Sequence, residues 1–174
     1  MSTMTSIEFR APWGQVLRAA TLISVALLTG LAVSGLLAYG RAPAYVSLLL
    51  ISLPPAILLG ALPFMIRGYV LTENAIVVRR LGWRTQLPLA GLTSIAGDAE
   101  AMRGSLRLLG NGGLFSFSGE FWNRRLGRFR ALATDPQRAV VLRYSRRIVV
   151  ITPHDPQQFI MRARTVLKTS QFPG

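Results

Sequence analysis

Two long stretches without a charged residue dominate the first half of this 174-residue chain. Residues 19–39 and 44–66 contain no Asp, Glu, Lys or Arg, and only the short segment 40–43, which includes Gly and Pro, separates them. An α-helix rises about 1.5 Å per residue, so each stretch is long enough to cross a hydrocarbon core of about 30 Å. Because the separating residues break a helix, the pattern predicts a hairpin of two antiparallel transmembrane helices.

Two other interpretations of these stretches remain open from the sequence. Helices buried in a soluble core would also be apolar, but such helices are usually shorter and keep a polar stripe. A cleaved signal peptide would account for residues 19–39, although 18 residues precede this stretch and it is long for a signal sequence. Even after cleavage, residues 44–66 would still anchor the protein in a membrane.

Basic residues flank the two stretches unevenly. The turn between the stretches contains only Arg41. The flanking segments contain Arg10, Arg18, Arg67, Arg79, Arg80 and Arg84. Short cytoplasmic segments of membrane proteins carry an excess of Lys and Arg, so the bias predicts a multi-pass protein of the cell membrane with both termini in the cytoplasm.

The interior of the two stretches is uncharged, whereas ion or proton transport normally requires an ionisable residue there. We therefore expect no transport activity. Small residues recur at every fourth position, a spacing that lets helix backbones approach closely but that a composition rich in Ala and Gly would also produce. They are Ala26, Gly30 and Ser34 in the first stretch and Ala56 and Gly60 in the second.

The chain has a formal net charge of +13, and most of this charge follows the apolar stretches. Residues 67–174 contain 17 Lys and Arg against 6 Asp and Glu. Such an excess favours an anionic partner, either nucleic acid or a membrane surface. No helix–turn–helix or RNP-type motif is present and the membrane anchor already supplies an anionic surface, so the sequence argues against a nucleic-acid partner.

From residue 69 the pattern changes to short apolar runs separated by turn residues, which is typical of an antiparallel β-fold. Asn74 tolerates the left-handed backbone of a tight turn, so it predicts a hairpin between the first two runs. The runs predict strands at residues 69–72, 75–80, 84–89, 92–95, 105–109, 128–134, 139–144 and 148–151.

A helix is expected at the C-terminal end of the chain. Asp155 is a suitable N-cap, and Pro156 suits the first helical position. Phe159, Ala163 and Val166 recur at helical spacing and predict one apolar face. The expected organisation is a cytoplasmic segment (1–18), a transmembrane hairpin (19–66), a cytoplasmic β-domain (67–169) and a tail (170–174).

Residues 104–127 contain six glycines with aromatic residues between them. This density fits either a bent β-region whose aromatic side chains fill the core or a mobile loop, and we favour the former. The aromatic residues are Phe115, Phe117, Phe121 and Trp122. No Gly-Lys-Ser/Thr sequence follows the glycines, which argues against a nucleotide-binding P-loop.

Three segments resemble the bacterial PH-domain (bPH) family of small membrane-anchored proteins. They are YVLTENAIVVRR at residues 69–80, GNGGLFSFSGEF at residues 110–121, and IVVITP with DPQQFI at residues 148–160. Similar proteins often have Phe-Gly where this chain has Phe115-Ser116, a departure that makes this loop less flexible. The similarity extends over residues 69–167, most of the segment that follows the apolar stretches.

The resemblance implies an α+β protein with a pleckstrin-homology-like (PH-like) domain. We expect a transmembrane hairpin followed by an antiparallel β-barrel or sandwich of about seven strands, capped by the C-terminal α-helix. The resemblance supplies no catalytic motif. The sequence itself has no cysteine and one histidine, His154, so a Cys or His cluster for zinc or iron cannot form.

The acidic residues of the β-region lie in expected turns, caps or loops, and nothing in their spacing predicts an acid–base pair or a metal site. We therefore predict a non-catalytic binding or assembly module without a cofactor or a metal. Two alternatives specify this further: an anionic-lipid headgroup-binding domain, and an oligomeric scaffold that docks a protein partner through a sheet edge. The candidate lipid contacts are Arg79, Arg80, Arg84, Arg124, Arg125, Arg128 and Arg130. The alternative explanation of these arginines is that they only keep the protein soluble.

Overall fold

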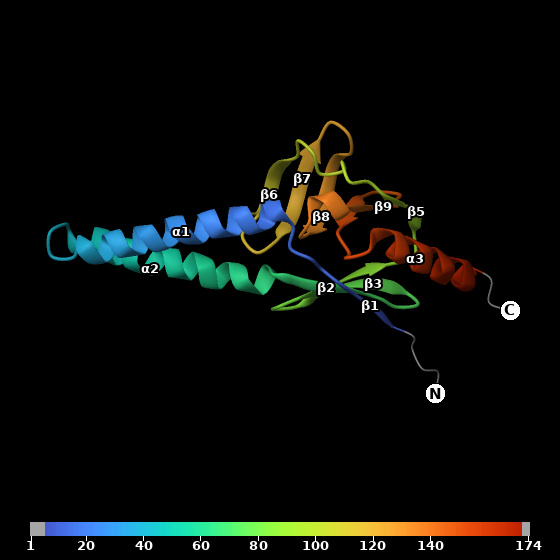
Figure 1. Cartoon of the computed structure of the whole chain (residues 1–174), viewed down its shortest axis with the longest axis horizontal. Coiled ribbons are helices and arrows are strands. Elements are labelled where there is room, and N and C mark those ends of the chain that lie inside the picture. Colours follow the sequence, from blue (N-terminus) through green and yellow to red (C-terminus); the bar gives the residue numbers. More distant parts are fainter. Residues whose placement is uncertain (1–5, 172–174) are drawn as a thin grey trace.

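The structure is a computed structural model that describes residues 6–171, with side chains up to residue 168. An apolar helical hairpin extends as a rod from one side of a β-domain, and a third helix lies on the other side of that domain (Figure 1). Most of the expected tail, at residues 172–174, and the first five residues lie outside the described residues.

The rod consists of α1 (Gln15–Leu37) and α2 (Ala44–Ala61), and a short 3-10 helix, η1 (Leu62–Phe64), follows α2. Both helices are long and apolar enough to cross a membrane. Leu22 and Leu27 of α1 are 70% and 65% exposed, so the rod is not the core of the β-domain. This exposure argues against the interpretation of the two stretches as buried core helices.

Of the glycines in the rod's two helices, Gly35 faces the partner helix, whereas Gly30 and Gly60 do not. A Cβ atom on Gly35 would lie 2.7 Å from the Cβ atom of Leu50, whereas a Cβ atom on Gly30 or Gly60 would meet nothing within 4 Å. The small-residue spacing therefore marks faces that point away from the partner helix. Composition alone does not tell which small residues face inward.

Four antiparallel strands form the first sheet in the order β1-β2-β3-β4. They are β1 (Ile7–Arg10), β2 (Ile66–Leu71), β3 (Ala75–Arg80) and β4 (Arg84–Pro88). The predicted hairpin between β2 and β3 is confirmed, but Asn74 does not have the left-handed backbone that was expected, because Phe115 is the only non-glycine residue with a positive φ angle among the described residues. The sequence analysis did not predict β1, a four-residue strand that precedes the rod and pairs with β2.

Six strands form the second sheet in the order β5-β9-β10-β8-β7-β6. They are β5 (Leu92–Gly97), β6 (Leu106–Gly112), β7 (Phe117–Asn123), β8 (Gly127–Ala133), β9 (Val140–Tyr144) and β10 (Ile148–Ile151). A short 3-10 helix, η2 (Pro136–Arg138), carries the chain from β8 past one strand position to β9. The β9–β10 hairpin then places β10 between β9 and β8, parallel to β8.

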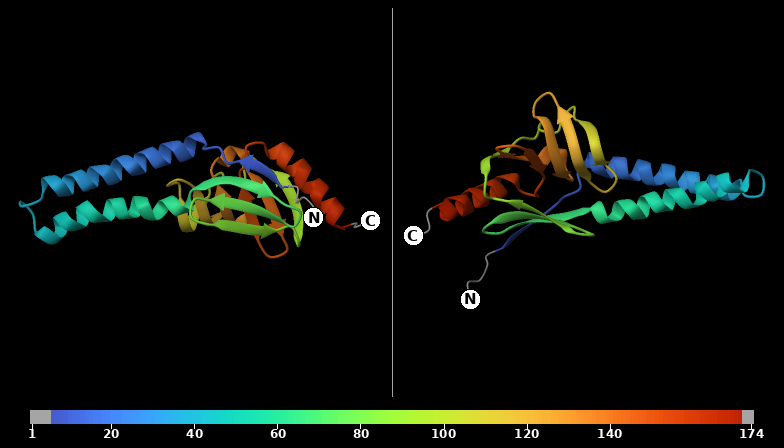
Figure 2. Two further views of the ribbon diagram at one scale, coloured as in Figure 1. Left: turned by 90° about the horizontal axis from the view of Figure 1, so that it is seen from below. Right: turned by 180° about the vertical axis from the view of Figure 1, so that it is seen from behind.

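The two sheets form an open sandwich rather than a closed barrel (Figure 2). The described residues contain ten strands, more than the expected seven, and one pair is parallel where the sequence analysis expected only antiparallel pairs. The C-terminal helix α3 (Pro156–Gln171) begins as predicted, because the Asp155 carboxylate accepts a hydrogen bond of 2.9 Å from the Gln158 backbone N–H. The expected α+β class with a PH-like sandwich is confirmed.

The glycine-rich segment forms the β6–β7 hairpin, as the structured alternative predicted. Gly110 lies opposite Gly119, and both have positive φ angles, of 103° and 150°. A Cβ atom on Gly119 would lie 2.1 Å from the Leu109 carbonyl oxygen, so this close pairing requires glycine. Phe117 and Phe121 fill a core as expected, whereas Trp122 is 40% exposed.

Apolar side chains cover both faces of the second sheet. Leu132 and Ile151 belong to a core between the two sheets, which Phe159 of α3 also joins. Phe129 on the opposite face belongs to a second core, which is completed by Leu17 from the first turns of α1. The base of the rod is therefore part of the β-domain's packing.

Candidate functional site

The rod and the first sheet meet at the turn between β3 and β4. The backbone N–H of Leu81 donates to the Met65 carbonyl oxygen over 2.9 Å, and that of Gly82 donates to Pro63 over 3.1 Å. The Trp83 ring packs edge-on against Phe64, with ring centroids 4.7 Å apart. This turn is therefore fixed against the end of α2.

Arg80 ends β3 beside this turn, and its side chain points between the sheets. Ile76 and Val78 lie on the same face of the strand and are fully buried in the core, because alternate residues of a strand share a face. Arg80 itself is only 8% exposed, and its guanidinium lies 5.2 Å from the centre of the Trp83 ring. Its Nε atom is buried and makes no hydrogen bond among the described residues.

Arg130 of β8 carries a second guanidinium into the same region. It shares a face of its strand with the buried Leu132, which faces the first sheet. Burial lowers the pKa of Arg80, and the positive charge of Arg130 lowers it further. No ion pair among the described residues includes Arg80 or Arg130.

Acidic groups are close to this pair of arginines but are directed to other cations. Glu120 lies opposite Arg130 in the β7–β8 register, yet its carboxylate contacts Arg128 Nε at 3.2 Å. The Tyr69 hydroxyl is the other ionisable group that influences Arg80, and it is neutral because its pKa is far above neutral pH. The pair therefore presents two positive charges that no described residue neutralises.

The other predicted arginines do not join this pair. Arg79 contacts Glu8, and Arg125 contacts Asp98 at 2.9 Å, both as ion pairs with exposed arginine side chains. Arg124 and Arg84 are exposed and form no ion pair among the described residues. Arg80 is thus almost fully buried and Arg130 half-buried, whereas Arg124 and Arg125 are exposed at the turn that joins β7 to β8.

The β6–β7 loop contacts both helices of the rod, which the sequence analysis missed. Thr21 Oγ1 of α1 donates to the Gly113 carbonyl oxygen over 3.0 Å and accepts from the Phe115 N–H over 3.2 Å. Ser116 Oγ donates to the Phe64 carbonyl oxygen after α2 over 3.0 Å. No local pattern predicts such contacts, since they join residues far apart in the chain.

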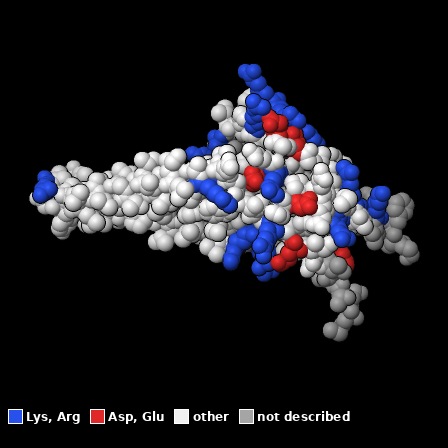
Figure 3. Space-filling view, in the orientation of Figure 1, with Lys and Arg blue, Asp and Glu red and all other residues white. Residues whose placement is uncertain are grey.

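The surface charge follows this arrangement. Lys and Arg atoms gather around the base of the rod and along the part of the β-domain that projects sideways from it (Figure 3). The rod itself is uncharged apart from its base and its far end, where the turn between α1 and α2 contains Arg41. On the face that Figure 3 shows, arginines therefore lie where the apolar surface begins, with acidic residues among them farther along the β-domain.

The buried Tyr69 joins the two sheets through its hydroxyl group. The hydroxyl donates to the Leu132 carbonyl oxygen over 2.8 Å and accepts from the Thr152 N–H over 3.2 Å. Burial raises the pKa of Tyr69 to about 12, although the bonds to Thr152 oppose this shift. Tyr69 is therefore neutral at physiological pH, and its hydrogen bonds are structural.

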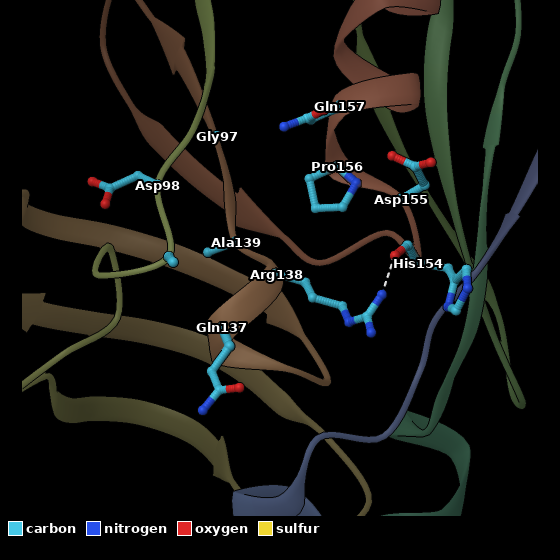
Figure 4. Close-up of a pocket in the computed structure, with 10 residues that line it drawn as sticks. Gly97, Asp98, Gln137, Arg138, Ala139, His154, Asp155, Pro156 and Gln157 are labelled. Atoms are coloured by element: carbon cyan, nitrogen blue, oxygen red, sulfur yellow. Dashed lines mark hydrogen bonds between the residues drawn. The ribbon is translucent and has the colours of Figure 1, made fainter.

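A hollow of about 590 Å³ lies between the end of β5, η2 and the start of α3 (Figure 4). Arg138 contacts the Asp135 carboxylate at 3.2 Å and also donates to the His154 carbonyl oxygen. The Asp98 carboxylate and the His154 ring point away from each other in Figure 4. These side chains do not converge on a point where a substrate could react.

The fold and its junction define a PH-like β-sandwich that an apolar helical hairpin carries at one end. The Bacterial PH domain family matches residues 67–167, more than half of the chain, and the chain belongs to this family. This match confirms the resemblance seen in the sequence, and it does not include the rod. No curated protein and no solved structure matches the chain.

Proposed function

We propose that the protein is a membrane-anchored, non-catalytic module that binds anionic lipid headgroups at the cytoplasmic surface. The rod spans the bilayer, and Arg80 and Arg130 hold a headgroup phosphate between them. One observation carries the proposal: Arg80 is almost fully buried, the positive charge of Arg130 lowers its pKa, and no described carboxylate pairs with either residue.

The spanning role of the rod is supported by its length and its exposure. α1 has 23 residues and would be about 35 Å long, enough for a hydrocarbon core of about 30 Å. Its exposed leucines would face lipid rather than water. The band of arginines at the base supports an orientation with the β-domain in the cytoplasm, where membrane proteins concentrate Lys and Arg.

A phosphate would meet the electrostatic needs of the two arginines. A buried cation that lacks an acceptor is costly, and a second cation nearby increases the cost. Guanidinium groups bind phosphate oxygens with paired, charge-assisted hydrogen bonds. Because the β3–β4 turn is bonded to the residues that follow α2, Arg80 would lie at the level of the headgroups.

Lipid selectivity can be measured on the full chain. The purified protein in detergent would be offered phosphatidylglycerol and phosphatidylcholine, and native mass spectrometry would count the lipids that it retains. We expect phosphatidylglycerol to be retained preferentially, and expect Arg80→Gln and Arg130→Gln to abolish the preference. The matched control is Arg125→Gln, which removes the same charge from a residue paired with Asp98.

Two results would contradict headgroup binding. One is a wild-type chain that retains both lipids equally at low salt, where electrostatic binding is strongest. The other is an equal loss of preference in Arg125→Gln, which would assign the effect to net charge rather than to the arginine pair.

Protease accessibility tests the orientation independently of the lipid. Trypsin should digest the β-domain in inverted membrane vesicles and leave it intact in right-side-out vesicles. Protection of the β-domain in inverted vesicles would reverse the proposed topology without affecting the arginine pair itself.

A further inference from the structure

Strand β6 forms an outer edge of the second sheet and exposes three leucines. Its other side pairs with β7, and its free edge pairs with no strand among the described residues. Leu106, Leu108 and Leu109 are 63%, 54% and 72% exposed. A free edge lined by large apolar side chains promotes aggregation unless another surface covers it.

Strand β6 is exposed on both of its faces and contains a β-bulge. The register between β6 and β7 shifts between Arg107 and Leu109, so Leu108 is the extra residue. Bulges occur at sheet edges and redirect side chains there. The Arg107 guanidinium donates to the Gly110 carbonyl oxygen over 3.3 Å and thus lies back along its own strand. The three leucines of β6 are therefore exposed, and the Arg107 guanidinium stays close to its own strand.

The position of β6 relative to the rod suggests what covers it. Among β6, β7 and β8, which project sideways from the domain, β6 is the strand on the side of the rod in both Figure 1 and the right-hand view of Figure 2. An open hollow is lined by Arg107, Gly110 and Leu114 and also by Gly60 and Ala61 of α2 and Phe64 of η1. The β6 edge thus continues the apolar surface of the rod at the point where α2 ends.

We propose that the β6 edge rests on the bilayer and inserts Leu106, Leu108 and Leu109 below the headgroups. This proposal rests on the spanning role of the rod and goes beyond the headgroup contact of Arg80 and Arg130. We assign lipid as the occupant for two reasons. The β6 edge lies beside the end of α2, at the level where a spanning helix would leave the hydrocarbon core. Arg107 lies next to the leucines, at the depth where lipid phosphates would be. The contact fixes the rotation of the domain on the membrane surface.

The chain contains no cysteine, so single labels can be placed without other changes. Spin labels at Leu108→Cys, Met161→Cys and Leu27→Cys would be compared in the full chain, reconstituted in lipid nanodiscs. Power saturation measures collisions with oxygen, which concentrates in lipid, and with a water-soluble nickel chelate. Met161 is the matched aqueous control, since it is 64% exposed on α3, and Leu27 is the reference within the rod.

We expect the oxygen-to-nickel accessibility ratio at Leu108 to lie closer to that of Leu27 than to that of Met161. A ratio equal to that of Met161 would place the edge in water and overturn the proposal. A second contrary result is a Leu108 label that neither oxygen nor nickel reaches and whose spectrum is broadened by a nearby spin. If adding unlabelled protein removes this broadening, a second copy of the chain covers the edge, and the proposal is also overturned. A nickel-accessible Leu27 would instead contradict the spanning role of the rod.

Discussion

The rod and the β-domain are both rich in apolar side chains but bury them to opposite extents. Leu27 of α1 is 65% exposed, whereas Leu132 of β8 is fully buried between the sheets. The β-domain closes its cores with Leu17 from the base of the rod, and beyond that base only the partner helix covers the rod in the part of the chain that the structure describes. Leucines of the β-domain are therefore buried by other protein side chains, whereas leucines of the rod need an apolar medium outside the protein, such as lipid.

The strongest test of this comparison shortens one leucine in each region. Leu132→Ala should lower the free energy of unfolding of the β-domain by about 2–5 kcal/mol, because it leaves a cavity in a packed core. Leu27→Ala should change it by less than about 0.5 kcal/mol, since the side chain contacts no core. Urea unfolding of the detergent-solubilised chain, followed by near-UV circular dichroism, would measure both changes. Similar losses in the two variants would break the comparison.

A charge introduced into each region sharpens the contrast. Leu27→Arg places a cation near the middle of α1 and should disfavour membrane insertion by about 3 kcal/mol. Met161→Arg adds the same side chain to an exposed position on α3 and should leave insertion unchanged. The fraction that resists carbonate extraction measures the effect. Full membrane retention of Leu27→Arg would indicate that α1 does not need a lipid environment.

Alkaline pH should destabilise the β-domain through Tyr69. The pKa is raised from 10.0 to about 12 in the folded state, so the hydroxyl ionises more readily when the chain unfolds. The stabilisation is therefore fully present below pH 10 and is lost as the pH rises through about 12, by about 3 kcal/mol in total. Unfolding free energies measured across this range should fall, and the fall should be smaller in Tyr69→Phe. An identical pH dependence in Tyr69→Phe would assign the effect to other groups.

The β-domain was predictable where the pattern is local. The apolar runs of β3 and β9 and the cap at Asp155 are short-range signals, and the structure contains each of them. β1 was missed because four residues before a long apolar stretch carry almost no periodicity. The parallel pairing of β10 with β8 was missed because pairing order depends on packing between distant strands.

The candidate site was predictable only in part for the same reason. The arginines are visible in the sequence, but which of them is buried and which is exposed depends on the register and packing of two sheets. One local signal was available: Arg80 follows Ile76 and Val78 on alternate positions, which places it on the buried face of β3. Nothing in the sequence indicates that the charge of Arg130 acts on it.

Within the rod, two glycines should respond differently to the same substitution. Gly35→Leu would force a side chain against Leu50, where a Cβ atom has only 2.7 Å of space, and should destabilise the hairpin by about 1–3 kcal/mol. Gly30→Leu meets no atom within 4 Å and should be neutral. Thermal stability of the full chain in detergent would be compared for the two variants. A larger loss in Gly30→Leu would place the helix interface on the face where small residues recur at every fourth position.

The smallest expected effect lies where the two regions are joined. Thr21→Val keeps the shape of the side chain and removes the hydroxyl that bonds Gly113 and Phe115 of the β6–β7 loop. Phe115 has a φ angle of 66°, a left-handed conformation that a non-glycine residue adopts only when its surroundings hold it. Losing its N–H acceptor should cost about 1 kcal/mol and loosen the loop.

Hydrogen exchange at the Phe115 amide is the direct readout of this prediction, and it should quicken in Thr21→Val. Ser52→Ala is the matched control, since it also removes one hydroxyl, which bonds only within α2. If both variants leave the exchange of Phe115 unchanged, the loop is held by its own turn rather than by the rod. If only Thr21→Val quickens it, the rod positions the β-domain through this contact as well as through Leu17 in the second core.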